Sequence, residues 1–140
     1  MESVKVSLAL LADAANVSEE GKLNILGIFD SIQVTSLPFQ LPHMVFVMRF
    51  EYSPAEAGHE KDMEVVLTNQ DGKVMGRLPG ELKLPTLIAP GMAYDDIVPL
   101  DGVIFPEEGD YVFTIMENQH TLCEVPVKII LTGGDVEDNK

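Results

Sequence analysis

The chain is poor in positive charge. Nine Lys and Arg stand against 23 Asp and Glu among its 140 residues, so its formal net charge is −14. Both halves share the deficit, so it is not an acidic tail on a neutral body. A protein that binds a nucleic-acid backbone needs a basic face for the phosphates, and we therefore exclude nucleic acid as a partner. The hydrophobic share of 46% still allows one buried core, and the length fits one domain.

Cysteine and long apolar runs are also scarce. Cys123 is the single cysteine, so no intramolecular disulfide can form and nothing asks for an oxidising compartment. Its place on an apolar strand face is typical of a small, unreactive core residue. The N-terminal apolar run over 6–12 is too short, and too closely followed by Asp13, for a good signal peptide. No run reaches the roughly 18 residues that span a bilayer. We expect a cytoplasmic protein without a membrane partner.

Recognisable catalytic motifs are missing as well. The sequence has neither a Gly-x-Ser-x-Gly elbow nor a phosphate-binding glycine loop. One Cys and three scattered His residues (His43, His59 and His120) make no zinc motif. We expect no cofactor and no enzyme activity. A hydrolase whose site is assembled from distant residues remains an alternative, because spatial proximity cannot be read from spacing.

What the sequence does contain is period-two alternation of apolar residues. It is clearest over 4–10, 44–52, 63–67, 111–115 and 123–131, and no long 3.6-residue period accompanies it. This pattern predicts an all-β fold, an immunoglobulin-like antiparallel β-sandwich of about eight strands, with a barrel as the lesser alternative. We expect one domain over residues 1–132, followed by a flexible acidic tail over 133–140.

Several local features refine this prediction. The apolar phase changes near Leu26 and Gly27, which predicts a β-bulge there and puts Ile28 on a core face. Pro126 cannot donate to a ladder, so the last strand should lie at a sheet edge. An acidic turn leads into Tyr111, as in sandwiches whose Tyr hydroxyl ties down the preceding corner. Residues 53–58 predict one helical turn, with a capping box made by Ser53 and Glu56.

The opening of the chain resembles an uncharacterised bacterial family of small single-domain proteins, described as a domain of unknown function. Leu11-Ala12-Asp13-Ala14-Ala15-Asn16-Val17 and then Gly21-Lys22-Leu23-Asn24-Ile25-Leu26-Gly27 with Phe29-Asp30 carry the likeness. Phe105-Pro106-Glu107-Glu108-Gly109-Asp110-Tyr111 and Phe113 extend it, so it covers almost the whole chain. The resemblance implies a bacterial source and one domain, and it brings no activity or substrate.

The acidic loops over 95–110 are the best candidates for metal chemistry. If the fold brings them to one end of the sandwich, their carboxylates could surround Ca²⁺, which prefers hard oxygen ligands. The candidates are Asp95, Asp96, Asp101, Glu107, Glu108 and Asp110. Acidic residues are equally ordinary in the turns of a protein this negative. A calcium- or small-ligand-binding module is therefore an alternative function.

Four polar residues of the opening, Asp13, Asn16, Asn24 and Asp30, could line a groove. We favour a structural role, with Asn16 in a turn and the two carboxylates satisfying backbone donors. Because the strand pattern is complete and no chemical constellation accompanies it, we expect a non-enzymatic interaction or structural module. Its partner is an unknown protein, with a homodimer through an edge strand or sheet face as one form.

Overall fold

The computed structural model describes residues 4–86 and 93–132. The tail expected over 133–140 and most of the apolar loop that ends at residue 92 lie outside these residues. The described chain forms eleven strands and one short 3₁₀ helix. The strands are β1 (Val4–Val17), β2 (Leu23–Phe29), β3 (Ser31–Val34), β4 (Phe39–Leu41), β5 (Met44–Tyr52), β6 (Glu60–Thr68), β7 (Val74–Lys83), β8 (Ala93–Leu100), β9 (Val103–Phe105), β10 (Gly109–Glu117) and β11 (His120–Leu131). No helix among the described residues is long and apolar enough to cross a membrane.

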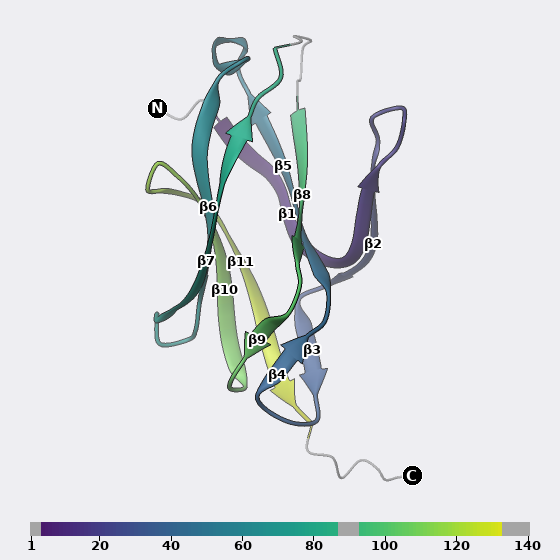
Figure 1. The fold of residues 1–140 in the computed structure, drawn as a ribbon, viewed down its shortest axis with the longest axis vertical. Coiled ribbons are helices and arrows are strands. Elements are labelled where there is room, and N and C mark those ends of the chain that lie inside the picture. The colour runs from purple at the N-terminus through teal and green to yellow at the C-terminus, as the bar shows by residue number, and fades with distance from the viewer. Residues whose placement is uncertain (1–3, 87–92, 133–140) are drawn as a thin grey trace.

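Two sheets form the layers of the sandwich (Figure 1). One has the strand order β2-β1-β5-β8, the other has the order β3-β11-β10-β6-β7, and β4 pairs with β9 alone. All pairings are antiparallel except that of β3 with β11. Consecutive strands β5 and β6 lie in different sheets, as do β8 and β10, and this alternation is the crossing pattern of immunoglobulin-like sandwiches. The all-β sandwich prediction is confirmed, and eight of the eleven strands have seven or more residues.

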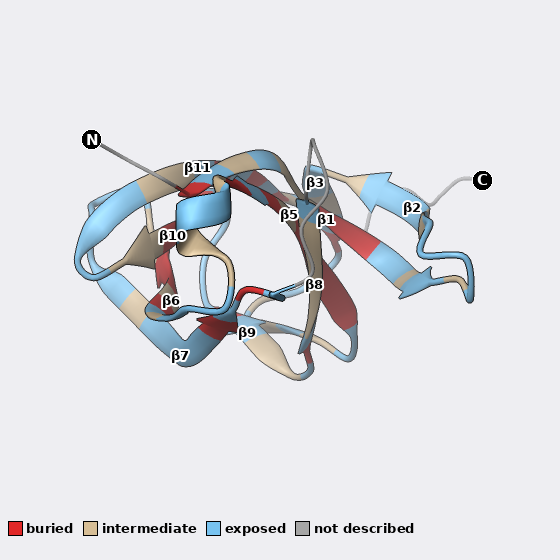
Figure 2. Ribbon diagram, turned by 90° about the horizontal axis from the view of Figure 1, so that it is seen from above, coloured by how far each residue is buried: buried red, intermediate tan, exposed pale blue. Residues whose placement is uncertain are grey.

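The core lies between the two layers. From β5 it receives Met44, Phe46, Met48 and Phe50, all with 0% exposure, because alternate side chains of a strand point to the same face. The ring of Phe46 meets that of Phe113 on β10 at a centroid distance of 5.6 Å. Figure 2 shows the buried segments concentrated where the sheets face each other. The alternating segment 44–52 forms a central strand, since β5 lies between β1 and β8.

Tyr111 closes the corner before β10 as the sequence predicts. It is 2% exposed, and its hydroxyl donates to the Glu107 carbonyl at 2.7 Å. The same oxygen accepts from the Glu107 backbone N–H at 3.2 Å. One side chain therefore satisfies both backbone groups of the turn that leads into the strand.

The bulge predicted at Leu26–Gly27 is wrong. The β1–β2 register runs without a shift from Leu11↔Phe29 to Val17↔Leu23, and the shift in this sheet lies between Val6 and Leu8 instead. Ile28 is 62% exposed, while its neighbour Phe29 packs on the core. The apolar phase changes after Phe29, because there the chain leaves the first sheet and starts β3 in the second.

Two further predictions are corrected in part. β11 is an edge strand over residues 120–127, since β3 pairs only with Lys128–Leu131 and leaves Pro126 without a neighbouring strand on that side. The helical turn is a 3₁₀ helix over Pro54–Glu56, but Ser53 makes no side-chain cap. Glu56 instead accepts from Lys61 Nζ at 2.6 Å, so the capping box does not form.

Candidate functional site

The first two calcium candidates lie within β8. Arg49 of β5 holds Asp95 in a two-pronged contact, with Nε–Oδ1 at 2.7 Å and Nη2–Oδ2 at 3.0 Å. This contact and the Asp95 carboxylate raise the pKa of Arg49. Asp96 lies opposite Met48, a core residue, and burial raises its pKa. A carboxylate on the inward side of an edge strand hinders the addition of another strand.

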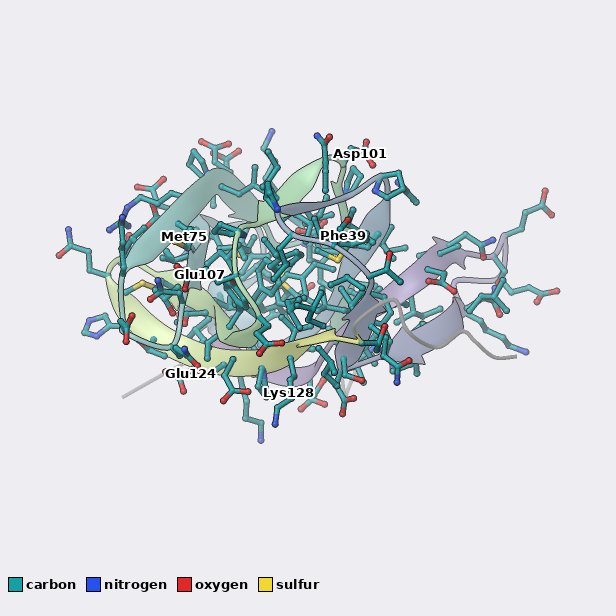
Figure 3. The ribbon with its side chains drawn as sticks, turned by 90° about the horizontal axis from the view of Figure 1, so that it is seen from below. Phe39, Met75, Asp101, Glu107, Glu124 and Lys128 are labelled. Carbon is teal, nitrogen blue, oxygen red and sulfur yellow. The ribbon has the colours of Figure 1, made fainter. Side chains whose placement is uncertain are left out.

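The remaining candidates are also engaged separately. Asp101 contacts the ring of His43, Glu108 Oε1 accepts from the Leu131 N–H at 3.2 Å, and Asp110 lies 3.8 Å from Lys128 Nζ. Figure 3 shows Asp101 at one margin of the molecule and Glu107 well away from it. Among the described residues, no three Asp, Glu, His or Cys side chains gather as metal ligands would. The structure therefore does not bring the six calcium candidates into one cluster.

Among the described residues, Cys123 makes no hydrogen bond to any of the three histidines. Cys123 is half-buried opposite Ile115, and burial raises the pKa of its thiol, which disfavours the nucleophilic thiolate. His43 contacts Asp101 and His59 lies 3.8 Å from Glu56. Within the described chain, no hydrogen bond links a histidine to the thiol or to a hydroxyl, so these residues do not form a nucleophile–base pair.

An apolar groove of about 380 Å³ opens between β7 and the β8–β9 turn. Its floor is made of core residues, including Leu67, Leu100 and Phe113, and Met75 lies on its wall. Arg77 and Asp101 are its only charged lining residues, and the lining has no Ser, Thr, Cys, His or Lys. The lining is therefore mainly apolar, with Asp101 as its one carboxylate.

The most unusual surface is the hairpin formed by β1 and β2. β5 pairs with β1 only as far as Ala12, so the end of β1 beyond it and the strand β2 extend past the sheet. In Figure 2 this hairpin projects from the body and most of it is exposed. Three large hydrophobic side chains on it face solvent: Leu26 at 71%, Ile28 at 62% and Val17 at 47%.

Of the four polar residues of this opening, the two asparagines bond across the hairpin, and among the described residues neither the Asp13 nor the Asp30 carboxylate accepts the backbone hydrogen bond predicted for it. Asn16 and Asn24 lie opposite each other, and the Asn24 side chain donates to Asn16 Oδ1 at 3.0 Å. Asn16 is thus a strand residue, so its predicted place in a turn is wrong. Gly27 has φ +75°, and a Cβ there would overlap the Asp13 carboxylate. Asp30 acts through its carbonyl, which accepts from the Lys128 N–H at 3.0 Å.

The hairpin also has an apolar side that packs against the body. Leu23 and Ile25 of β2, with Ala15 of β1, pack against a small buried cluster on the first sheet. That cluster consists of Ala12, Val45 and Val47, with exposures of 0%, 5% and 0%. Contacts on this side fix the hairpin relative to the sheet, although both strands lack further pairing at its end.

The outer strands of the two main sheets differ in how open they are to a further strand. β8 contains Asp95, Asp96 and Pro99, β7 contains three charged residues and a proline, and β3 is only four residues long. Charge, proline and shortness are the usual means of blocking an edge. The seven residues of β2, Leu-Asn-Ile-Leu-Gly-Ile-Phe, include no charge and no proline. Sequence reasoning missed this surface, although the uncharged run from 23 to 29 was its visible signal.

Comparison with known proteins adds a family and a fold. A family model described as a family of unknown function (DUF6941) matches residues 7–130. No sequence among the curated proteins matches the chain.

Three solved structures illustrate the likeness of fold. The alkylpurine DNA glycosylase AlkC of Pseudomonas fluorescens, bound to DNA containing an abasic-site analog, is similar at TM-score 0.53 and 11% identity over 91% of this chain and 30% of its own. A β-glucosidase of Erythrobacter marinus is similar at TM-score 0.50 and 10% identity, over 91% of this chain and 15% of its own. An immunoglobulin-like protein of Pseudomonas aeruginosa is similar at TM-score 0.46 and 15% identity, over 91% of this chain and 97% of its own. The chain spans less than a third of the glycosylase and the glucosidase, and likeness at this identity concerns the fold alone.

Proposed function

The chain belongs to the DUF6941 family of unknown function, and we propose that it is a non-enzymatic protein-interaction module that binds its partner along the β1–β2 hairpin. The observation that carries the proposal is the open edge of β2. It is seven residues long, uncharged and free of proline, and it carries Leu26 and Ile28 at 71% and 62% exposure. A partner strand added to such an edge gains main-chain hydrogen bonds and apolar contacts together.

The other edges of the same molecule support this assignment. β7 and β8 carry charged residues and proline, which disfavour the addition of a further strand at these two edges. An exposed apolar edge left open is an aggregation hazard unless a partner covers it. The groove also supports binding rather than catalysis, because its lining is mainly apolar and holds no Ser, Thr, Cys, His or Lys beside Asp101. The proposed module acts in the cytoplasm of a bacterium.

The test compares capture by the wild-type protein with capture by Leu26→Lys, which places on β2 the charge that blocks other edges. Ile104→Lys on β9 is the matched control, because Ile104 is 53% exposed and lies outside the hairpin. Proteins from a lysate of the source organism should be retained by the wild type and by Ile104→Lys and lost by Leu26→Lys. A purified retained protein should then protect the amides of residues 23–29 from hydrogen exchange. Equal retention by Leu26→Lys, or protection elsewhere, would refute the hairpin as the binding surface.

A further inference from the structure

We infer that the partner strand on β2 is β2 of a second copy of this chain, paired antiparallel across a twofold axis at Leu26. This inference rests on the proposed function, because it uses the same edge. The pairing would join two sheets of order β2-β1-β5-β8 into one continuous eight-stranded sheet. A twofold contact needs a surface that complements itself, and β2 meets that condition in its charges and in its apolar residues.

The charges at the two ends of β2 complement each other. Lys22 precedes the strand and Asp30 follows it, and both are exposed. Within the described chain, neither side chain forms an ion pair. In an antiparallel pair centred on Leu26, the numbers of two facing residues add up to 52. Lys22 of one copy therefore faces Asp30 of the second copy. The symmetry forms this contact twice, although each chain carries a net charge of −14.

Neighbouring registers lack this match. Centring the pair on Ile25 would place Glu20 opposite Asp30, two like charges. Centring it on Gly27 would place Lys22 opposite Ile32 and leave Asp30 opposite Asn24. Of these three registers, only the one centred on Leu26 places opposite charges next to each other. It also brings together the two copies of Leu26, which at 71% is the most exposed of the large hydrophobic residues in the described chain.

The expected dimer is weak. Seven residues a side are paired, whereas a standard stable interface engages about 20–30 residues a side. Association should therefore depend on protein concentration.

Light scattering after size exclusion, from low micromolar to about millimolar protein, tests the inference on the purified full chain. The wild type should pass from monomer to dimer. Lys22→Glu and Asp30→Lys should each weaken association about tenfold, and the double variant Lys22→Glu/Asp30→Lys should recover it. Lys73→Glu is the matched control, because it makes the same charge change as Lys22→Glu in the exposed turn between β6 and β7.

The outcomes separate this inference from the proposed function. A wild type that stays monomeric throughout, a Leu26→Lys variant that dimerises like the wild type, or a double variant that fails to recover would each overturn the homodimer. If hairpin-dependent capture of another protein persists in that case, the proposed function survives with a different partner. If capture is also indifferent to Leu26→Lys, both are overturned.

Discussion

The contact between Gly27 and Asp13 gives the sharpest test of how the hairpin is built. Gly27 has φ +75°, a conformation that costs an L-residue about 1–2 kcal/mol. A Cβ at this position would also lie 2.8 Å from Cγ and 3.0 Å from Cβ of Asp13. Rotation of the Asp13 side chain can move Cγ but not Cβ, so the overlap is not fully relieved. Crowding of this kind adds about 1 kcal/mol or more.

Gly27→Ala should therefore lower the free energy of unfolding by about 2–3 kcal/mol, the sum of the conformational cost and the crowding. Gly72→Ala isolates the first contribution, because Gly72 has φ +81° and a Cβ there meets no atom within 4 Å. It should cost only about 1–2 kcal/mol. Adding Asp13→Ala to Gly27→Ala should return part of the difference, since Cγ and the carboxylate oxygens are then gone while Cβ stays.

Urea unfolding of the four proteins measures these values, and hydrogen exchange of the β2 amides measures opening confined to the hairpin. The reasoning fails if Gly27→Ala costs no more than Gly72→Ala in both measurements. It also fails if Asp13→Ala gives no recovery in the Gly27→Ala background.

Three further predictions concern the body of the sandwich. Tyr111→Phe removes both hydrogen bonds to Glu107 and should cost about 1–2 kcal/mol in urea unfolding; an unchanged midpoint would contradict the corner's role. Burial raises the pKa of Asp96 above the ordinary aspartate value of 3.8, so the native state binds that proton more tightly and wild-type stability falls as the pH rises above 3.8. The Asp96→Asn variant has no carboxyl to ionise, so its free energy of unfolding minus that of the wild type should be larger at pH 7 than at pH 4. A difference that does not change with pH would refute this prediction. Burial also raises the pKa of Cys123, so iodoacetamide at pH 8 should alkylate the folded protein more slowly than the urea-unfolded one, and equal rates would show an open thiol.

The fold was largely predictable because the strands of a sandwich show one face to the core. The alternation over Met44–Tyr52 identified β5, and the acidic turn before Tyr111 identified the corner. These are local patterns, in which neighbouring residues carry the whole signal. The three-residue strands have no such signal: β4, at Phe39–Leu41, exists because Phe39 can pair with Phe105 of β9, and a pairing so distant is not visible in the sequence.

The candidate surface was harder to predict for a related reason. Apolar alternation predicts burial, and that prediction is wrong at Ile28, whose side chain is 62% exposed. Which strands lie at an edge is a property of the sheet order, and sheet order cannot be read from one sequence. The acidic loops were over-interpreted in the same way, because sequence proximity of Asp95 and Asp101 does not place their carboxylates together. Asp95 instead binds Arg49 across the β5–β8 pair.

The parallel pairing of β3 with β11 has a consequence for how the protein is made. Val34 on β3 is 2% exposed in the finished fold, yet its neighbour Leu131 lies almost a hundred residues later in the chain. At a synthesis rate of roughly 5–20 residues per second, β3 waits on the order of 5–20 s for that partner. β1 and β5 can pair much sooner, since even their most distant partners, Val4 and Tyr52, are fewer than fifty residues apart. The β1–β5 pair can thus form before the second sheet is complete, and during that interval Val34 lacks the β11 neighbour beside which it is buried.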